Sequence, residues 1–318
     1  MKQCRLKLAG RVTASNFCKR DLSIVTNCYV PSSCASYLEL FEPTLEEESN
    51  VVNYSRKASK QVEEPVSNII TFSQNSSPSD GFFVATTNGS LSCHSFDESG
   101  FREVSCCENA HEGTILALDY CSKNKLLYSG SHDGALKVWD VRCFCKKREA
   151  LLFSPASLDC CCCITHSNVN DLHKVFVGTQ NGDVCLYDTR INRDNALEKF
   201  SFGDSISNLF AVAASVLVVS TFSQVYKLNF LLAHNSLLYQ DSNTCIVGIS
   251  ANQCNELSIA DRTRRLLLVN CKNSSVQKNV FSKGKGYWTK VGWHSTLPVY
   301  SAVSYKSLEF GVFPPTSV

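Results

Sequence analysis

The sequence predicts an all-β protein that repeats one small antiparallel sheet seven times. The clearest repeat is residues 110–142, AHEGTILALDYCSKNKLLYSGSHDGALKVWDVR, where three β-rich runs are separated by short polar turns. Similar triplets recur along the 318 residues, from KLAGRVTA, DLSIVTNCYV and SYLELFE to YWTKVGWHS, PVYSAVSYK and SLEFGVF. A small sheet cannot cover its own apolar faces, so we expect all seven to form a single domain over residues 1–318.

Composition indicates a globular protein, because 44% of the residues are hydrophobic and 19% are charged. The formal net charge of +2 gives no field strong enough to imply nucleic acid or an anionic membrane as partner. The start, MKQCRLKLAG, lacks the apolar stretch of a signal peptide, and no later run is long enough to span a membrane. We therefore expect an intracellular protein, in the cytoplasm and nucleus.

The 18 cysteines are scattered, several of them in strand-like runs, which indicates reduced thiols rather than a disulfide framework. We interpret Cys160–Cys163 as a buried strand, because neighbouring side chains of a strand point to opposite faces and cannot converge on a metal ion. Cys106, Cys107 and His111 lack the further ligands of a zinc site. We expect no metal and no cofactor.

Residues 110–142 resemble a WD40 repeat, with a histidine in the leading turn and a Trp-Asp pair closing the third strand. The resemblance implies a seven-bladed WD40 β-propeller. It also implies a structural tetrad, a buried chain of hydrogen bonds that maps onto His111, Ser129, Asp133 and Trp139. We expect these four residues to be structural rather than catalytic, since no nucleophile accompanies them.

A weaker copy follows, in which KVFVGTQNGDVCLYDTR has Tyr187 in place of the tryptophan. Third strands are expected to end near Phe41, Phe96, Trp139, Tyr187, Leu228, Val269 and Phe313. The blades are then approximately residues 1–60, 61–100, 101–142, 143–190, 191–230, 231–271 and 272–318. Two intervals are long, and we interpret Glu42–Pro65 and Cys143–Asp159 as surface loops between blades.

Propeller blades bind partners through turns and insertions, which gives three candidate surfaces. The first is the loop Pro31–Tyr37 with the acidic run Glu46–Glu48 after it, for which a solvated linker is the alternative. The second is basic and aromatic, and consists of Lys283, Lys285, Tyr287, Trp288 and Lys290 with Arg262, Arg264 and Arg265. RNA binding uses such residues, but solvated turns around a core tryptophan explain them better.

The third surface follows the third strands of the two best repeats. Trp139–Arg142 resembles the W-D-x-R motif of cullin-4 substrate receptors, and Tyr187–Arg190 echoes it. Arg142 and Arg190 are therefore candidate partner-binding residues. Basic residues after a Trp-Asp pair are also common because they keep the surface soluble, and this alternative stays open.

The order of features along the chain also resembles the WD-repeat subunits of arginine methyltransferase complexes, the methylosomes. The resemblance rests on SYLELFEP, VEEPVSNIITF, GFFVATTNGSLSCHSFDESGF, KVWDVR and TKVGWHSTLPVYSAVSYKSLEFGVFPP. It implies a non-catalytic scaffold that docks a protein arginine methyltransferase and helps present histone tails and Sm proteins as substrates. In that family an aromatic anchor near the first-blade insertion grips the enzyme, and Cys34 and Tyr37 occupy the corresponding stretch here.

No catalytic motif stands in a suitable context, since the chain offers no nucleophile elbow, phosphate-binding glycine loop, H-E-x-x-H helix or paired carboxylates. We therefore expect a protein that is not an enzyme. Three functions fit the sequence: the methyltransferase scaffold, a cullin-4 substrate receptor that uses Arg142, and a structural scaffold such as a nucleoporin or RNA-processing subunit.

Overall fold

The computed structural model describes residues 3–18, 22–46, 51–73, 80–97, 100–144, 151–153, 159–167, 172–191, 195–213, 215–251, 256–270, 276–282, 286–293, 299–304 and 307–312. These residues form seven antiparallel sheets of four strands each and one 3-10 turn, Val141–Cys143. The predicted fold class, an all-β protein with the seven blades of a β-propeller, is confirmed. Within the described residues, no helix is long and apolar enough to cross a membrane.

The chain divides into two compact units, residues 1–110 with 288–318 and residues 111–287. We number the sheets as blades 1 to 7 in chain order; the first unit holds blades 1, 2 and 7, and the second unit holds blades 3 to 6. The prediction of one domain over residues 1–318 stays a prediction.

The first unit contains the two ends of the chain. Blade 1 consists of β2 (Arg11–Phe17), β3 (Ile24–Val30), β4 (Ala35–Glu46) and β5 (Val51–Val62). Blade 2 consists of β6 (Val66–Ser73), β7 (Asp80–Thr86), β8 (Leu91–Asp97) and β9 (Gly100–Cys107). Blade 7 consists of β26 (Lys290–Trp293), β27 (Val299–Ser304), β28 (Ser307–Val312) and β1 (Gln3–Lys7). The predicted first blade, residues 1–60, therefore begins only at Arg11, because β1 pairs with β28.

The second unit contains four blades with strands in chain order. Blade 3 consists of β10 (Ile115–Cys121), β11 (Leu126–Ser131), β12 (Leu136–Asp140) and β13 (Leu151–Phe153). Blade 4 consists of β14 (Cys161–His166), β15 (Lys174–Thr179), β16 (Asp183–Asp188) and β17 (Glu198–Ser201). Blade 5 consists of β18 (Asn208–Ala213), β19 (Val216–Ser220), β20 (Gln224–Asn229) and β21 (His234–Gln240). Blade 6 consists of β22 (Ile246–Ala251), β23 (Glu256–Asp261), β24 (Arg265–Asn270) and β25 (Val276–Phe281).

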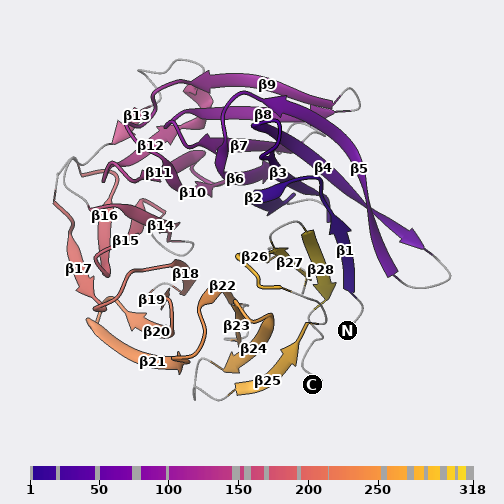
Figure 1. Cartoon of the computed structure of the whole chain (residues 1–318). Coiled ribbons are helices and arrows are strands. Elements are labelled where there is room, and N and C mark those ends of the chain that lie inside the picture. The colour runs from indigo at the N-terminus through magenta and orange to yellow at the C-terminus, as the bar shows by residue number, and fades with distance from the viewer. Residues whose placement is uncertain are drawn as a thin grey trace. The chain divides into compact units, whose positions relative to one another are not determined.

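Burial falls from the inner strands of a blade to its fourth strand. In blade 3 every residue of β11 is buried, whereas most residues of β17 and β21 are exposed. Within the second unit the first strands β10, β14, β18 and β22 lie side by side, and the fourth strands lie at the outer edge (Figure 1). Neighbouring blades bury apolar side chains against each other, as Tyr128 and Val138 of blade 3 do against Val177 and Tyr187 of blade 4.

Five of the third strands end close to the positions expected from the sequence, whereas two expected loops contain strands. Strands β8, β12, β16, β20 and β24 each end one residue beyond the expected position, while Phe313 lies outside the described residues. The interpretation of Glu42–Pro65 as a loop is wrong, because β4 runs to Glu46 and pairs with β5 along its length. The interpretation of Cys143–Asp159 as a loop is wrong at residues 151–153, which form β13.

Strands β4 and β5 form a hairpin that extends past the rest of blade 1, since the pairing of β3 with β4 ends at Phe41 (Figure 1). Tyr54 of this extension stacks on Phe310 of blade 7, with ring centroids 3.9 Å apart. Its hydroxyl donates a hydrogen bond to the carbonyl of Leu22 over 3.0 Å. The hairpin is therefore fixed to the first unit at Tyr54.

Candidate protein-binding sites

The four residues of the expected tetrad lie in one hydrogen-bonded chain in blade 3. The Trp139 indole N–H donates to Ser129 Oγ over 2.8 Å, and Ser129 Oγ lies 2.8 Å from His111 Nε2. His111 Nδ1 lies 3.2 Å from Asp133 Oδ2, and Asp133 also accepts the backbone N–H groups of Glu112 and Ala135. These hydrogen bonds link the leading turn of blade 3 to its second and third strands, so the four residues have a structural role.

Burial lowers the pKa of His111 to about 4. The carboxylate of Asp133 raises the pKa, but this effect is smaller than that of burial. The imidazole is therefore neutral at pH 7, so that Nδ1–H donates to Asp133 and Nε2 accepts the Ser129 hydroxyl proton. Because the folded pKa lies below the unfolded one, this histidine contributes stability above pH 6.5. That contribution is lost as the pH falls from 6.5 towards 4.

Removing the hydroxyl of Ser129 should destabilise the protein by about 2 kcal/mol, because buried polar atoms of His111 and Trp139 would lose their common partner. Urea unfolding of Ser129→Ala measures this loss. Ser236→Ala, at an exposed position of β21, is the control and should change stability by less than about 0.5 kcal/mol. Equal stability of the two variants would contradict a stabilising role of the tetrad.

Blades 3 and 4 carry the same Asp–Arg pair directly after their third strands. Arg142 Nε and Nη2 donate to Asp140 Oδ1 and Oδ2 over 2.8 and 2.6 Å. Arg190 Nε and Nη2 donate to Asp188 Oδ1 and Oδ2 over 2.9 and 2.5 Å. The arginine side chains are 69% and 52% exposed, so both two-pronged pairs present an ordered guanidinium to solvent.

The two aspartates also accept backbone hydrogen bonds from the residues that follow each third strand. Asp140 Oδ1 accepts the backbone N–H of Arg142 over 2.9 Å, and Asp188 Oδ1 accepts that of Arg190 over 3.0 Å. Hydrogen bonds from the two arginines keep the pKa of both carboxyl groups below the usual range. Each aspartate is therefore ionised at neutral pH and fixes its arginine in one orientation.

In blade 1, Cys34 and Tyr37 lie in different environments. Cys34 is exposed in the turn before β4, where its φ is 49°, and its thiol lies 3.6 Å from the carbonyl of Pro31. Tyr37 lies within β4, is half-buried, and pairs with Cys28 and Gln61 on the neighbouring strands. Only part of Tyr37 is available to a partner.

Trp288, a candidate partner-binding residue of the basic and aromatic surface, is fully buried, and its indole N–H donates to Glu309 over 3.1 Å. Burial removes it from any binding surface, so that prediction is corrected. Its neighbour Tyr287 is 63% exposed, and Arg262 lies over its ring at 5.5 Å. Lys283 and Lys285 lie outside the described residues.

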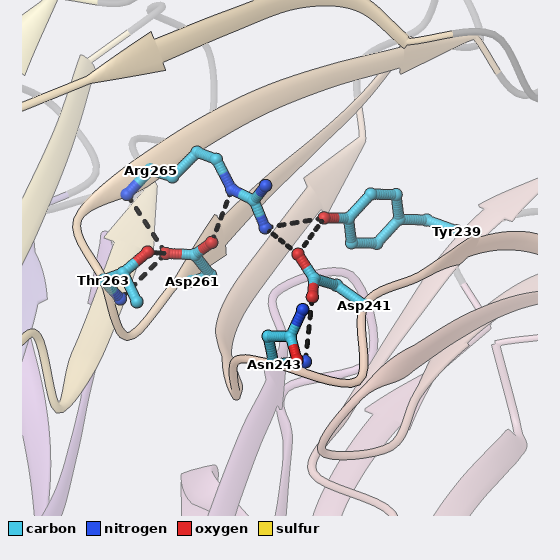
Figure 2. A network of polar contacts seen from close by, with 6 residues as sticks. All are labelled: Tyr239, Asp241, Asn243, Asp261, Thr263 and Arg265. Carbon is cyan, nitrogen blue, oxygen red and sulfur yellow. Dashed lines mark hydrogen bonds and ion pairs between the residues drawn. The ribbon is translucent and has the colours of Figure 1, made fainter.

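The remaining arginines of the basic surface are not presented to solvent. Arg264 is buried and donates to Ser282. Arg265 lies between Asp261, which accepts from Nε over 2.7 Å, and Asp241, which accepts from Nη2 (Figure 2). Two carboxylates thus neutralise Arg265, and the structure weakens the RNA-binding alternative.

Cys160–Cys163 lies where blade 4 begins, and its last three residues open β14, in agreement with the strand interpretation. Cys161 is buried against blade 3, where a Cβ on Gly130 would approach its Cβ to 2.8 Å. Within the described part of the chain, no three metal-binding side chains gather at one point.

Residues 102–140, which include most of blade 3, match the family model of the WD domain, G-beta repeat. This segment of blade 3 is therefore similar to a WD40 repeat.

The chain is also similar in sequence to two longer proteins over part of its length, and similar in fold to a solved structure. "Restriction of telomere capping protein 1" of Candida albicans (strain SC5314) is 28% identical over 146 residues, which is 45% of this chain and 13% of the relative. The protein of the same name from Candida tropicalis is 28% identical over 112 residues, 34% of this chain and 10% of the relative. The chain thus matches a small fraction of these longer proteins.

The crystal structure of Chaetomium thermophilum Raptor superposes with a TM-score of 0.78 over 98% of this chain and 29% of that chain. At 8% identity this likeness shows the fold alone. The seven-bladed fold suits a role in protein–protein interaction, and no partner follows from the fold alone.

Proposed function

We propose that the protein is a non-catalytic scaffold that binds an adaptor protein through Arg142 and Arg190, in the manner of cullin-4 substrate receptors with a W-D-x-R motif. One observation carries the proposal: two consecutive blades hold the same pair of a buried aspartate and an exposed arginine at the end of the third strand. Solubility alone requires exposed charge, but it does not require an arginine fixed on an aspartate by two hydrogen bonds.

The energetic argument rests on preorganisation. A free arginine loses side-chain entropy when a partner binds it, whereas Arg142 and Arg190 are already oriented by their aspartates. Arginine is also among the residues that most often dominate interface energy. Two such residues on adjacent blades suit one protein partner that spans both.

The double variant Arg142→Ala/Arg190→Ala should reduce adaptor binding by at least about tenfold, which corresponds to the loss of about 1.4 kcal/mol. Co-purification of the full chain from its own cells, quantified by mass spectrometry, measures the adaptor and the cullin. Urea unfolding should be nearly unchanged, because both arginines are more than half exposed.

Arg102→Ala, at an exposed position of β9, is the matched control and should leave binding unchanged. Retention of the adaptor by the double variant, or absence of any cullin-4 adaptor from the wild-type eluate, would refute the proposal. Recovery of nuclear-pore or RNA-processing proteins instead would favour a structural scaffold.

A second candidate is the scaffold of an arginine methyltransferase complex, which presents histone or Sm-protein substrates. The specific observation in its favour is the β4–β5 hairpin of blade 1, which extends past the sheet and is held by Tyr54. The exposed Cys34 turn lies at the other end of β4, beside the half-buried Tyr37. An enzyme that grips this blade would contact both ends of the hairpin.

The same purification separates the two candidates when the eluate is tested for arginine methylation. A co-purifying methyltransferase that is lost in Tyr37→Ala, and retained in Arg142→Ala/Arg190→Ala, would support the second candidate. Either partner fits our expectation of a protein in the cytoplasm and nucleus, which fluorescence microscopy of the tagged chain would check.

A further inference from the structure

An open groove of about 630 Å³ lies across blades 3, 4 and 5, within the second unit. His132, Gln180, Asp204 and Phe222 line it from turns. Cys160, just before β14, and Cys162, within β14, also line it. None of these positions was singled out as a binding residue from the sequence. The groove has the size of a site for one or a few side chains of a bound peptide.

The groove is placed apart from the Asp–Arg pairs. His132 precedes β12 and Arg142 follows it, and Gln180 precedes β16 while Arg190 follows it. The two features therefore lie at opposite ends of the same third strands. A partner in the groove leaves Arg142 and Arg190 accessible, so this inference is independent of the proposed function.

The cysteines give the groove an uncharged lining. Burial, followed by the neighbouring thiol of Cys162, raises the pKa of Cys160 to about 11, and burial also raises the pKa of Cys162. Both thiols are protonated at neutral pH. The charge in the groove therefore comes from its turns.

That charge is negative. Asp204 is exposed, and Asp133 and Asp159 lie close enough to Cys160 to raise its pKa. No lysine or arginine stands among the described residues that line the groove. A cation is thus the complementary ligand for this surface.

Two of the side chains that line the groove, an aromatic ring and a carboxylate, are of the types that bind a planar cation. Phe222 is 50% exposed although it is a large aromatic residue, and its carbonyl accepts the backbone N–H of Ile246 over 2.7 Å, which holds its turn. Asp204 lies in a segment that is tied to blade 4 by hydrogen bonds from Phe202 to Gly182 and from Ile206 to Thr179. The backbone at both positions is therefore held in place before any ligand binds, and Asp204 Oδ1 accepts a hydrogen bond from the backbone N–H of Ser205 over 2.8 Å.

We propose that this groove binds an arginine side chain of a partner peptide, with the guanidinium stacked on Phe222 and paired with Asp204. An aromatic face attracts a cation, and a carboxylate accepts two parallel hydrogen bonds from a guanidinium. Lysine would satisfy the charge but would not stack or form the two-pronged bond. The occupant is accordingly an arginine-containing segment of another protein.

The test uses the full chain and a fluorescein-labelled peptide of alternating glycine and arginine, followed by fluorescence anisotropy at physiological salt. The arginine peptide should bind saturably to one site, the lysine counterpart several-fold more weakly, and the glutamate counterpart not at all. Phe222→Ala and Asp204→Asn should each weaken the arginine peptide by about tenfold, because each removes one of the two contacts. Phe222→Tyr should retain binding, since it keeps an aromatic face.

Matched controls lie outside the groove. Phe281→Ala removes another aromatic residue that is 65% exposed, and Glu198→Gln removes another exposed carboxylate. Both should bind the arginine peptide as the wild type does. The proposal is overturned if the wild type shows no saturable binding, if Phe222→Ala and Asp204→Asn bind normally, or if the controls weaken binding equally.

Discussion

Replacing Arg265 by alanine should lower the free energy of unfolding by about 3 kcal/mol, because it leaves the buried carboxylate of Asp261 without its cation. Asp261 would retain three donors, the backbone N–H groups of Thr263 and Arg265 and the Thr263 hydroxyl (Figure 2). These donors stabilise the charge only in part, since Asp261 is fully buried. Urea unfolding of the full chain measures the change.

The network around Arg265 also joins two blades, which adds to the expected loss. Arg265 Nη2 donates to the hydroxyl of Tyr239 over 2.8 Å, and that hydroxyl donates to Asp241 over 3.2 Å. Burial raises the pKa of Tyr239 to about 12, so its proton is present at pH 7. Tyr239 and Asp241 belong to the end of blade 5, whereas Asp261 and Arg265 belong to blade 6.

Arg262→Ala is the matched control, since Arg262 is exposed and three residues away. It should change stability by less than about 0.5 kcal/mol. The pair Arg265→Ala and Asp261→Asn forms a double-mutant cycle, in which the second change should recover part of the first loss because it removes the buried charge. A loss below about 1 kcal/mol for Arg265→Ala would show that the network does not bind the blades together.

Blade 3 could be predicted in detail because its signals are local. A polar turn with glycine, a leading histidine and a terminal Trp-Asp pair all fall within residues 110–142, and Gly134 adopts the left-handed φ of 82° that such a turn needs. The same locality placed Arg142 and Arg190 directly after their strands. Each of these features depends on residues within one blade.

The fourth strands could not be predicted, because an outer strand faces solvent and need not alternate. The sequence of β5, VVNYSRKASKQV, and that of β17, EKFS, read as polar linkers. Strand β1 pairs with β28 from the other end of the sequence, and no pattern within either segment indicates this pairing. Outer strands are recognised by pairing rather than by periodicity.

Contacts between distant positions account for the other differences. Trp288 has lysines near it in sequence, which suggested a surface, but Glu309 supplies a buried acceptor from another strand. Phe222 and Asp204 are single residues in separate turns, and only the fold brings them to one groove. Asp119 and His166 are likewise 47 residues apart and belong to different blades.

Replacing His166 by phenylalanine should destabilise the protein by about 3 kcal/mol at pH 6, because it breaks a largely buried ion pair between blades 3 and 4. His166 Nδ1 lies 2.6 Å from Asp119 Oδ2, and the same oxygen accepts the backbone N–H of His166. The imidazole also stacks on Tyr128, with ring centroids 5.9 Å apart. Phenylalanine keeps the stacking and removes the charge.

The stability lost in His166→Phe should become smaller as the pH rises, because His166 loses its charge at high pH. Burial lowers the pKa of His166, but the carboxylate of Asp119 raises it further, to about 10. A folded pKa above the unfolded value of 6.5 means that the contribution is fully present below pH 6.5 and is lost as the pH rises towards 10. The other titratable groups beside the imidazole are Cys121 and Tyr128, which both variants retain.

Unfolding curves of the wild type and His166→Phe, measured from pH 6 to pH 10, should therefore converge as the pH increases. His234→Ala, at an exposed position of β21, is the control and should change stability by less than about 0.5 kcal/mol. A gap between wild type and His166→Phe that stays constant would mean that His166 acts through packing alone. Convergence would show that the charged pair stabilises the contact between blades 3 and 4 at neutral pH, in addition to their apolar packing.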